Sequence, residues 1–221
     1  MNTRPRIVPL GDSALLVQFG EEIDLEINLR VHALDAFLRA AKPSHIVETV
    51  PAYATLLVQY DPIAITYAQA SDWVKAEMDR VDPLVSRKSR RIEVPVRYGG
   101  EAGPDLEFVA TFHHLTTREV VRLHCAREYV IFMMGFTPGF PYMGKLDEAI
   151  ITPRLESPRT RVPAGSVGIA GGQTGIYPID SPGGWRIIGR TSLNLFDPTL
   201  SPPFLFSPGD EVRFVTEATD A

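Results

Sequence analysis

The 221-residue sequence has little of several features that would define a protein class at once. Its single cysteine, Cys125, excludes an internal disulfide and a zinc site built from several cysteines. No long apolar run follows the N-terminus, because the stretch 14–17 has only four residues whereas a membrane-spanning helix needs roughly 20. No internal repeat or low-complexity tract is present. We therefore expect a cytoplasmic protein without a membrane span.

Charge of either sign is also not in large excess. Lys and Arg number 22 and Asp and Glu number 27, which gives a net charge of −5. Proteins that bind nucleic acids or anionic membranes normally have a basic excess, so we expect neither as a partner. Apolar residues make up 44% and charged residues 22% of the chain, which is typical of a folded globular protein.

The acidic excess is confined to the first part of the chain. Residues 1–86 carry 7 basic and 12 acidic side chains, a net charge of −5, whereas residues 87–221 carry 15 of each. The change coincides with the polar run 86–91, which follows Asp82-Pro83 and is typical of a linker. We therefore predict two domains, 1–86 and 87–221.

The apolar pattern of residues 1–86 predicts an α+β domain. Strands are expected at 7–9, 14–19, 45–50 and 54–60, and helices at 25–41 and 67–81. The order strand, strand, helix, strand, strand, helix indicates an antiparallel sheet with both helices on one face, and we predict a ferredoxin-like sandwich.

Residues 87–221 are expected to be mainly β-structure. The stretch 135–210 contains 12 glycines and 11 prolines in 76 residues, which excludes long helices. Helices are predicted at 105–112 and from a capping box at Thr116 and Glu119 to about residue 124. Strands are predicted at 91–98, 129–134, 166–170, 185–191 and 211–215, the first near a sheet edge because Pro95 lacks an N–H donor. Turn signals roughly every 8–12 residues indicate a sandwich or closed barrel.

Two glycine-containing motifs come close to known catalytic loops but lack a required feature. The segment 139–146 differs from a phosphate-binding loop at Leu146, where a magnesium-binding hydroxyl is needed. The segment 164–168 resembles a nucleophile elbow around Ser166, but a poor helix start follows it. His113 and His114 are adjacent, so their side chains diverge and no metal site is expected.

An arginine cluster is the strongest indication of a binding site. Arg154, Arg159 and Arg161 lie within eight residues, and glycine-rich turns follow at 171–175 and 181–186. The arginine side chain binds carboxylate or phosphate through two hydrogen bonds, and glycine lets backbone amides approach an anion. The pattern predicts an anion or carboxylate site, with a surface of structural turns as the alternative. The aromatic residues that could enclose such a site are Phe136, Phe140, Tyr142 and Trp185.

Longer motifs in the same region resemble a known family. They are GFTPGFPYMG at 135–144, PRTRVPAGSVGIA at 158–170, QTGIYP at 173–178, SPGGW at 181–185 and IGRT at 188–191, with GDSALLV at 11–17 in support. Together they resemble the family of bacterial 5-oxoprolinase B subunits, also called allophanate hydrolase subunit 1, which includes the inhibitor of a sporulation histidine kinase. The resemblance covers nearly the whole chain. The sequence departs from the family pattern at Lys145, where many members have Gly, and at Gly172, where many members have Asn.

The resemblance implies a fold and a set of partners. It implies a cyclophilin-like β-barrel after the N-terminal α+β domain, and an obligate partner, the homologous C subunit (allophanate hydrolase subunit 2 type). The two subunits are expected to use ATP, with magnesium, to activate the lactam carbonyl of 5-oxoproline, and the A subunit of 5-oxoprolinase to complete hydrolysis to L-glutamate. The chain alone is expected to be inactive.

The resemblance also guides the choice of site residues. Arginines suit the anionic groups of the substrate, neutral polar groups suit its amide, and aromatic residues shape a pocket. The residues expected to contact substrate are Arg159, Arg161, Gln173, Thr174, Phe140 and Tyr142, with His124 as the candidate general acid/base. Two alternatives stay open, hydrolysis of allophanate as a urea-derived amide, and non-enzymatic inhibition of a histidine kinase. A substrate panel separates 5-oxoproline from allophanate.

Overall fold

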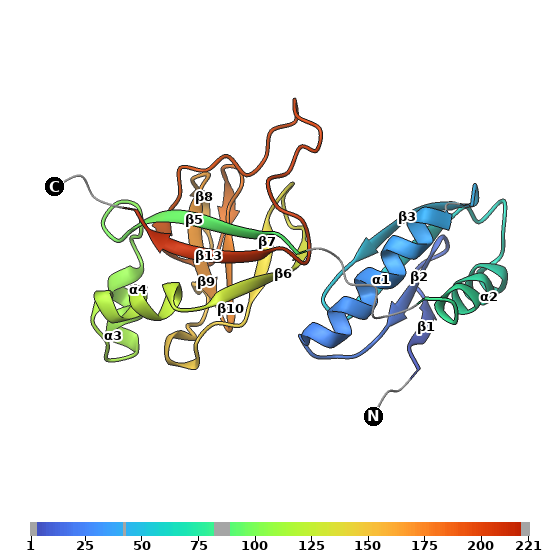
Figure 1. Ribbon diagram of the computed structural model, residues 1–221, viewed down its shortest axis with the longest axis horizontal. Coiled ribbons are helices and arrows are strands. Elements are labelled where there is room, and N and C mark those ends of the chain that lie inside the picture. The colour runs from blue at the N-terminus through green and yellow to red at the C-terminus, as the bar shows by residue number, and fades with distance from the viewer. Residues whose placement is uncertain (1–3, 42, 82–88, 218–221) are drawn as a thin grey trace. The chain divides into compact units, whose positions relative to one another are not determined.

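A computed structural model describes residues 4–41, 43–81 and 89–217. The chain divides into two units, Met1–Arg87 and Lys88–Ala221 (Figure 1). The boundary predicted between residues 86 and 87 lies outside the described residues. Among the helices that the structure describes, none combines the length and apolar character needed to cross a membrane.

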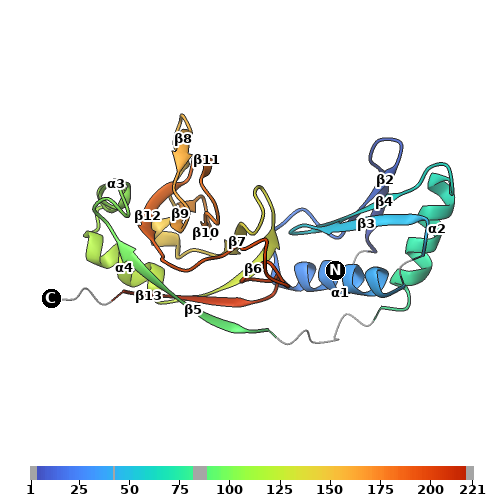
Figure 2. The same cartoon turned by 90° about the horizontal axis from the view of Figure 1, so that it is seen from above.

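The first unit is a four-stranded antiparallel sheet with two helices. Its strands have the order β1-β2-β4-β3. Alternate residues of β2 and β4 and the apolar stripes of both helices form one buried cluster, so both helices pack on the same face of the sheet. Figure 2 shows α1 running along the sheet. The elements are β1 (Arg6–Pro9), β2 (Ala14–Gln18), α1 (Leu25–Ala41), β3 (Ile46–Pro51), β4 (Thr55–Tyr60) and α2 (Tyr67–Met78).

The predicted α+β sandwich is present, whereas its ferredoxin-like connectivity is not confirmed. A ferredoxin-like chain runs βαββαβ, so its last strand enters the sheet after the second helix. Here the chain runs ββαββα, and the edge strand β1 comes before β2. β1 pairs with β2 from Arg6↔Gln18 to Pro9↔Leu15. The N-terminal strand β1 thus occupies the edge position that the final strand takes in the ferredoxin-like order.

The second unit is built around a closed β-barrel, which fits the cyclophilin-like architecture expected for it. Its strand order is β10-β7-β6-β13-β5-β12-β9, and β9 closes the barrel by pairing with β10. The barrel strands are β5 (Arg91–Tyr98), β6 (Glu128–Met134), β7 (Pro141–Gly144), β9 (Ser166–Ala170), β10 (Gln173–Ile176), β12 (Arg186–Arg190) and β13 (Glu211–Thr216). The remaining elements are α3 (Leu106–Phe112), α4 (Thr117–Cys125), the 3₁₀ turn η1 (Glu148–Ile150), and a separate strand pair, β8 (Arg159–Val162) and β11 (Ser181–Gly183).

Apolar side chains fill the barrel and hold the two short helices against one end of it. Alternate residues of β5 and β13 point inward, among them Val94 and Phe214, and join one buried cluster with Val109 of α3 and Val120 of α4. Both views show α3 and α4 side by side at that end (Figures 1 and 2). The barrel therefore provides a rigid frame for the residues discussed below.

The prediction that β5 lies near a sheet edge holds only for the part that contains Pro95, where β13 is the paired strand and β12 does not reach. β5 pairs in parallel with β13 from Arg91 to Val96, and it pairs with β12 at Arg97 and Tyr98. The strand is therefore part of the closed barrel. Pro95 is tolerated because β12 reaches only the last two residues of β5, so the missing N–H breaks no hydrogen bond between these strands.

Candidate functional site

The candidate general acid/base, His124, is fully buried on α4. Its ring packs against Tyr129 and Phe214. Its Nδ1 lies 2.7 Å from the Tyr98 hydroxyl, and its Nε2 lies 2.9 Å from the Thr174 hydroxyl. Burial lowers the pKa of His124 from 6.5 to about 3, so the imidazole is uncharged at neutral pH.

The hydrogen bonds around His124 run in one consistent direction. Thr174 donates its hydroxyl proton to the Gly168 carbonyl at 3.1 Å and therefore accepts from the Nε2–H of His124. Nδ1 then accepts from the Tyr98 hydroxyl. Both ring nitrogens have partners within the chain, which favours a positioning role for His124 and Thr174. The assignment of His124 as general acid/base stays a prediction.

Cys125 lies next to this network, and its thiol is a poor nucleophile at neutral pH. Its Sγ lies 3.4 Å from the Tyr98 hydroxyl. Burial raises the pKa of the Cys125 thiol, and its hydrogen bond with the Tyr98 hydroxyl only partly offsets that effect. Since the thiolate is the reactive form of cysteine, this environment disfavours nucleophilic catalysis.

Arg159, the first predicted anion-binding residue, is held by a buried carboxylate. Its Nη2 donates to Asp105 Oδ1 at 2.8 Å, and its Nη1 lies 3.5 Å from the Trp185 carbonyl oxygen. The other Asp105 oxygen accepts from the Ile187 amide at 2.7 Å. Asp105 is only 6% exposed and thus ties β8 to β12. The sequence signals Asp105 only weakly, as the first residue of the helix predicted at 105–112.

Arg161, two residues further along β8, forms an exposed ion pair. Its Nε and Nη2 donate to Asp180 Oδ2 at 2.8 and 2.6 Å. Asp180 Oδ1 accepts from the Ala164 amide at 2.8 Å. The Ala164 amide, and after it the Arg161 guanidinium, lower the pKa of the Asp180 carboxyl. The same bonds fix the turn that follows β8.

The aromatic residues gather around Phe140, which is almost completely buried. Its ring centroid lies 4.8 Å from that of Tyr142 and 5.3 Å from that of Trp185. Phe140 therefore supports the cluster from inside, whereas the half-buried Tyr142 reaches its surface. The guanidinium carbon of Arg154 lies 5.9 Å from the Trp185 ring centroid, which adds a positive charge to this aromatic surface. Gln173 begins β10 and is half-buried.

The structure thus brings only some of the predicted residues together. His124 and Thr174 share a hydrogen bond, and Arg159 reaches the aromatic cluster through Trp185. Arg161 joins Asp180 instead. In the ranges 4–41, 43–81 and 89–217, no three His, Cys, Asp or Glu side chains are grouped to hold a metal ion. These groups hold one another in position, and they include no complete pair of nucleophile and base.

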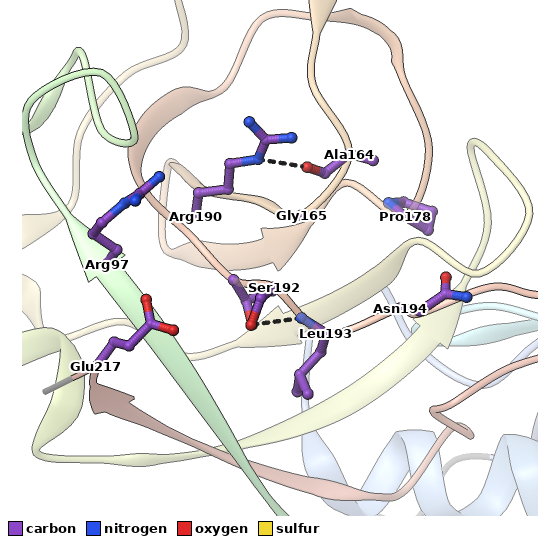
Figure 3. Close-up of a pocket in the computed structure, with 10 residues that line it drawn as sticks. Arg97, Ala164, Gly165, Pro178, Arg190, Ser192, Leu193, Asn194 and Glu217 are labelled. Atoms are coloured by element: carbon purple, nitrogen blue, oxygen red, sulfur yellow. Dashed lines mark hydrogen bonds between the residues drawn. The ribbon is translucent and has the colours of Figure 1, made fainter.

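A cavity of about 510 Å³ lies elsewhere on the barrel unit (Figure 3). Its volume is in the range of small-molecule sites. None of the predicted site residues lines it. Three of the motifs noted in the sequence contribute to its lining: the segment 158–170 supplies Ala164 and Gly165, the segment 173–178 supplies Pro178, and the segment 188–191 supplies Arg190 and Thr191. Polar and charged residues in its lining are Arg97, Arg190, Thr191, Ser192, Asn194 and Glu217.

Comparison with known proteins gives a consistent family assignment. The family model described as carboxyltransferase domain, subdomain C and D, matches residues 5–206. The 5-oxoprolinase B subunit of Bacillus subtilis (strain 168) is 44% identical and is aligned over 97% of this chain and 94% of its own length. The urea amidolyase of Lachancea kluyveri is 28% identical over 96% of this chain, which spans only 13% of that protein.

A solved structure supports the same assignment. The crystal structure of TTHA0988 matches with a TM-score of 0.83 and 38% sequence identity over 93% of this chain, which spans only 40% of that longer chain. Because the family model and a 44% identical relative both match nearly the full length, the motifs noted in the sequence are those of true relatives. The chain therefore belongs to the carboxyltransferase-domain family, subdomain C and D, together with the B subunits of 5-oxoprolinase.

Proposed function

We propose that this protein is the B subunit of an ATP-dependent 5-oxoprolinase, which activates 5-oxoproline for hydrolysis to L-glutamate. The observation that carries the proposal is the 44% identity to the B subunit of a 5-oxoprolinase over 97% of this chain and 94% of that protein. A match over both full lengths covers both units of the chain, so it supports a shared role more strongly than one shared domain would.

The proposed chemistry requires groups that bind anions and a lactam. ATP, bound with magnesium by the complex, would supply the phosphoryl group that activates the lactam carbonyl carbon for attack by water. We assign binding of substrate anions to Arg159 and Arg161. A guanidinium has five N–H donors, so the ion pairs with Asp105 and Asp180 orient these arginines and leave further donors free.

Neutral and aromatic side chains complete the proposed site. Gln173 would hydrogen-bond the amide group of the substrate, and Tyr142 would form an apolar wall. Phe140 and Thr174 would support the residues that contact substrate, since both side chains are buried. His124 would fix Thr174 through their 2.9 Å hydrogen bond.

The geometry also supports the role of a protein that works with partners. The groups assembled around His124, Arg159 and Tyr142 bind and position, but they include no activated nucleophile. We propose that the homologous C subunit completes the site and that the A subunit completes the hydrolysis, in the cytoplasm. This arrangement explains why turnover by the isolated chain is not expected.

Co-expression with the C subunit tests the proposal. We expect ATP hydrolysis by the purified pair to be stimulated by 5-oxoproline, and the isolated chain to show no such activity. Arg159→Ala should reduce the stimulation, whereas the control Arg118→Ala, which removes an exposed charge from α4, should leave it unchanged. A purified pair that hydrolyses no ATP in the presence of both 5-oxoproline and the A subunit would refute the proposal.

A second candidate substrate is allophanate, a urea-derived amide. It is favoured by the 28% identity to a urea amidolyase over 96% of this chain. The same purified pair, assayed with allophanate in place of 5-oxoproline, distinguishes the two. Stimulation by allophanate alone would replace our first proposal with this one.

A further inference from the structure

Two arginine side chains oppose each other across the pairing of β5 with β12. The strand register places Arg190, the last residue of β12, directly opposite Arg97. Like charges at directly opposed positions destabilise a sheet. Both side chains are exposed, and within the described part of the chain neither takes part in an ion pair. An anion bound between them would remove the repulsion.

Both arginines line the 510 Å³ cavity, and one of them has a fixed direction. Arg190 Nε donates to the Ala164 carbonyl at 2.9 Å, which leaves its two terminal nitrogens for other partners (Figure 3). The charge of Arg190 also contributes to the lowered pKa of Asp180, but Asp180 is already bound to the Ala164 amide and to Arg161. The remaining donors of Arg190 are therefore available to a ligand.

The backbone beneath the arginines is tightly packed. The Thr191 amide donates to the Gly165 carbonyl at 2.9 Å, and the Gly165 amide donates to the Tyr177 carbonyl at 2.7 Å. A Cβ on residue 165 would lie 2.2 Å from the Thr191 carbonyl oxygen, so only glycine fits there. The turn before β9 and the end of β12 thus form a preorganised wall, which reduces the entropy lost on binding.

One acidic residue in the cavity lining, Glu217, can accept a hydrogen bond from a ligand. Glu217 lines the same space as Arg97 and Arg190 (Figure 3). Its amide donates to the Val96 carbonyl at 2.9 Å, which holds it next to the end of β5. The other seven residues of the lining are uncharged, so two arginines and one glutamate give a net charge of +1. This charge matches one carboxylate and disfavours a polyphosphate.

We propose that this cavity binds a small amino-acid-type ligand. The carboxylate of the ligand lies between Arg97 and Arg190, and an N–H group on its other side donates to Glu217. Ser192 and Asn194 supply neutral hydrogen-bonding groups in the lining. The site uses none of the residues assigned above to 5-oxoprolinase activity. The proposal therefore does not depend on that activity.

Isothermal titration of the full chain without its partners tests this site. The probes are L-glutamate, L-5-oxoproline, glutarate, which lacks an N–H group, and inorganic phosphate. We expect saturable 1:1 binding of at least one of the first two. Arg97→Ala and Arg190→Ala should each weaken it about 10- to 150-fold, the range for loss of a charge-assisted contact, and Arg118→Ala should leave it unchanged.

Two further variants separate binding roles from structural ones. Arg190→Lys keeps the charge but removes the planar fork, so it should also weaken binding while the melting temperature stays at the wild-type value. Glu217→Gln should weaken binding of the amino-acid probe and leave glutarate binding unchanged. The proposal is overturned if no probe binds, if phosphate binds as tightly as the amino-acid probes, or if the arginine variants bind like the wild type. Failure of the ATPase assay would leave this result unaffected, because the titration requires no complex.

Discussion

Burial of His124 should make the stability of the barrel unit depend on pH. The pKa of His124 is about 3 in the folded chain, against 6.5 for an exposed histidine. Below pH 6.5 the unfolded chain therefore takes up a proton that the folded chain does not. The neutral imidazole of His124 therefore contributes its full share to the free energy of unfolding above pH 6.5, the pKa in the unfolded chain. That share is lost progressively as the pH falls from 6.5 toward 3.

The size of the effect follows from these two pKa values. Each pKa unit corresponds to about 1.4 kcal/mol. At pH 5 the solution is about 1.5 units below the unfolded pKa of the imidazole, so we expect a loss of about 2 kcal/mol in the free energy of unfolding. The carboxyls with lowered pKa values, such as Asp147 and Asp180, lose their contribution only below about pH 5. The window from pH 7 to pH 5 therefore separates the imidazole of His124 from these carboxyls, and comparison with a chain that lacks His124 separates it from the other four histidines.

Urea unfolding followed by tryptophan fluorescence measures this loss. The chain has two tryptophans, so Trp73→Phe leaves Trp185 as the reporter of the barrel unit. In the Trp73→Phe background we expect the free energy of unfolding to fall by about 2 kcal/mol between pH 7 and pH 5 when His124 is present. When His124→Gln is added, the free energy of unfolding should fall much less. Equal losses in the two chains would refute the conclusion that the imidazole is buried and neutral.

Substitutions at three residues test other contacts. Asp105→Ala should lower the free energy of unfolding by about 3 kcal/mol, because it leaves the Ile187 amide without an acceptor and removes the carboxylate partner of the partly buried Arg159. Asp105→Asn, which keeps an acceptor, should cost less, and an equal cost would contradict this reason. Gly183→Ala should abolish folding or lower the melting temperature strongly, since its Cβ would lie 2.3 Å from the Tyr177 hydroxyl oxygen; a wild-type melting curve would disprove that packing. Arg161→Ala removes an exposed ion pair and should change the free energy of unfolding by less than about 1 kcal/mol in urea titrations, and a larger loss would show that the pair is structural.

Most elements could be predicted because their signals lie within a few residues of each other. The helix expected at 25–41 is α1, and the strand expected at 166–170 is β9. The capping box also forms as predicted, since Thr116 Oγ1 accepts from the Glu119 amide at 3.2 Å and the Glu119 carboxylate accepts from the Thr116 amide at 2.8 Å. Such contacts depend on local spacing alone, so the sequence is sufficient to specify them.

The candidate site was less predictable because its contacts join distant parts of the chain. The sequence indicated that Arg159 and Arg161 belong to an anion or carboxylate site, but it did not indicate that they pair with Asp105 and Asp180 within the chain. Neither acid stands at a spacing that marks it as a partner. An arginine can be recognised as an anion-binding residue from its type, but which anion it meets depends on tertiary packing.

The amino-acid sequence alone was sufficient to recognise the family, the order of helices and strands in the first unit, and the contrast between an α+β part and a β-rich part. It did not predict the short strands β7, β8, β10 and β11. Only the tertiary structure decided which strands are neighbours. The pairing of β5 with β12 places Arg97 opposite Arg190, and the pairing of β5 with β13 brings Glu217 to the same cavity. Alternation along a strand predicts which face a side chain occupies, but it carries no information about the partner strand. The partner and the register follow from closure of the barrel, which depends on the packing of all seven strands together.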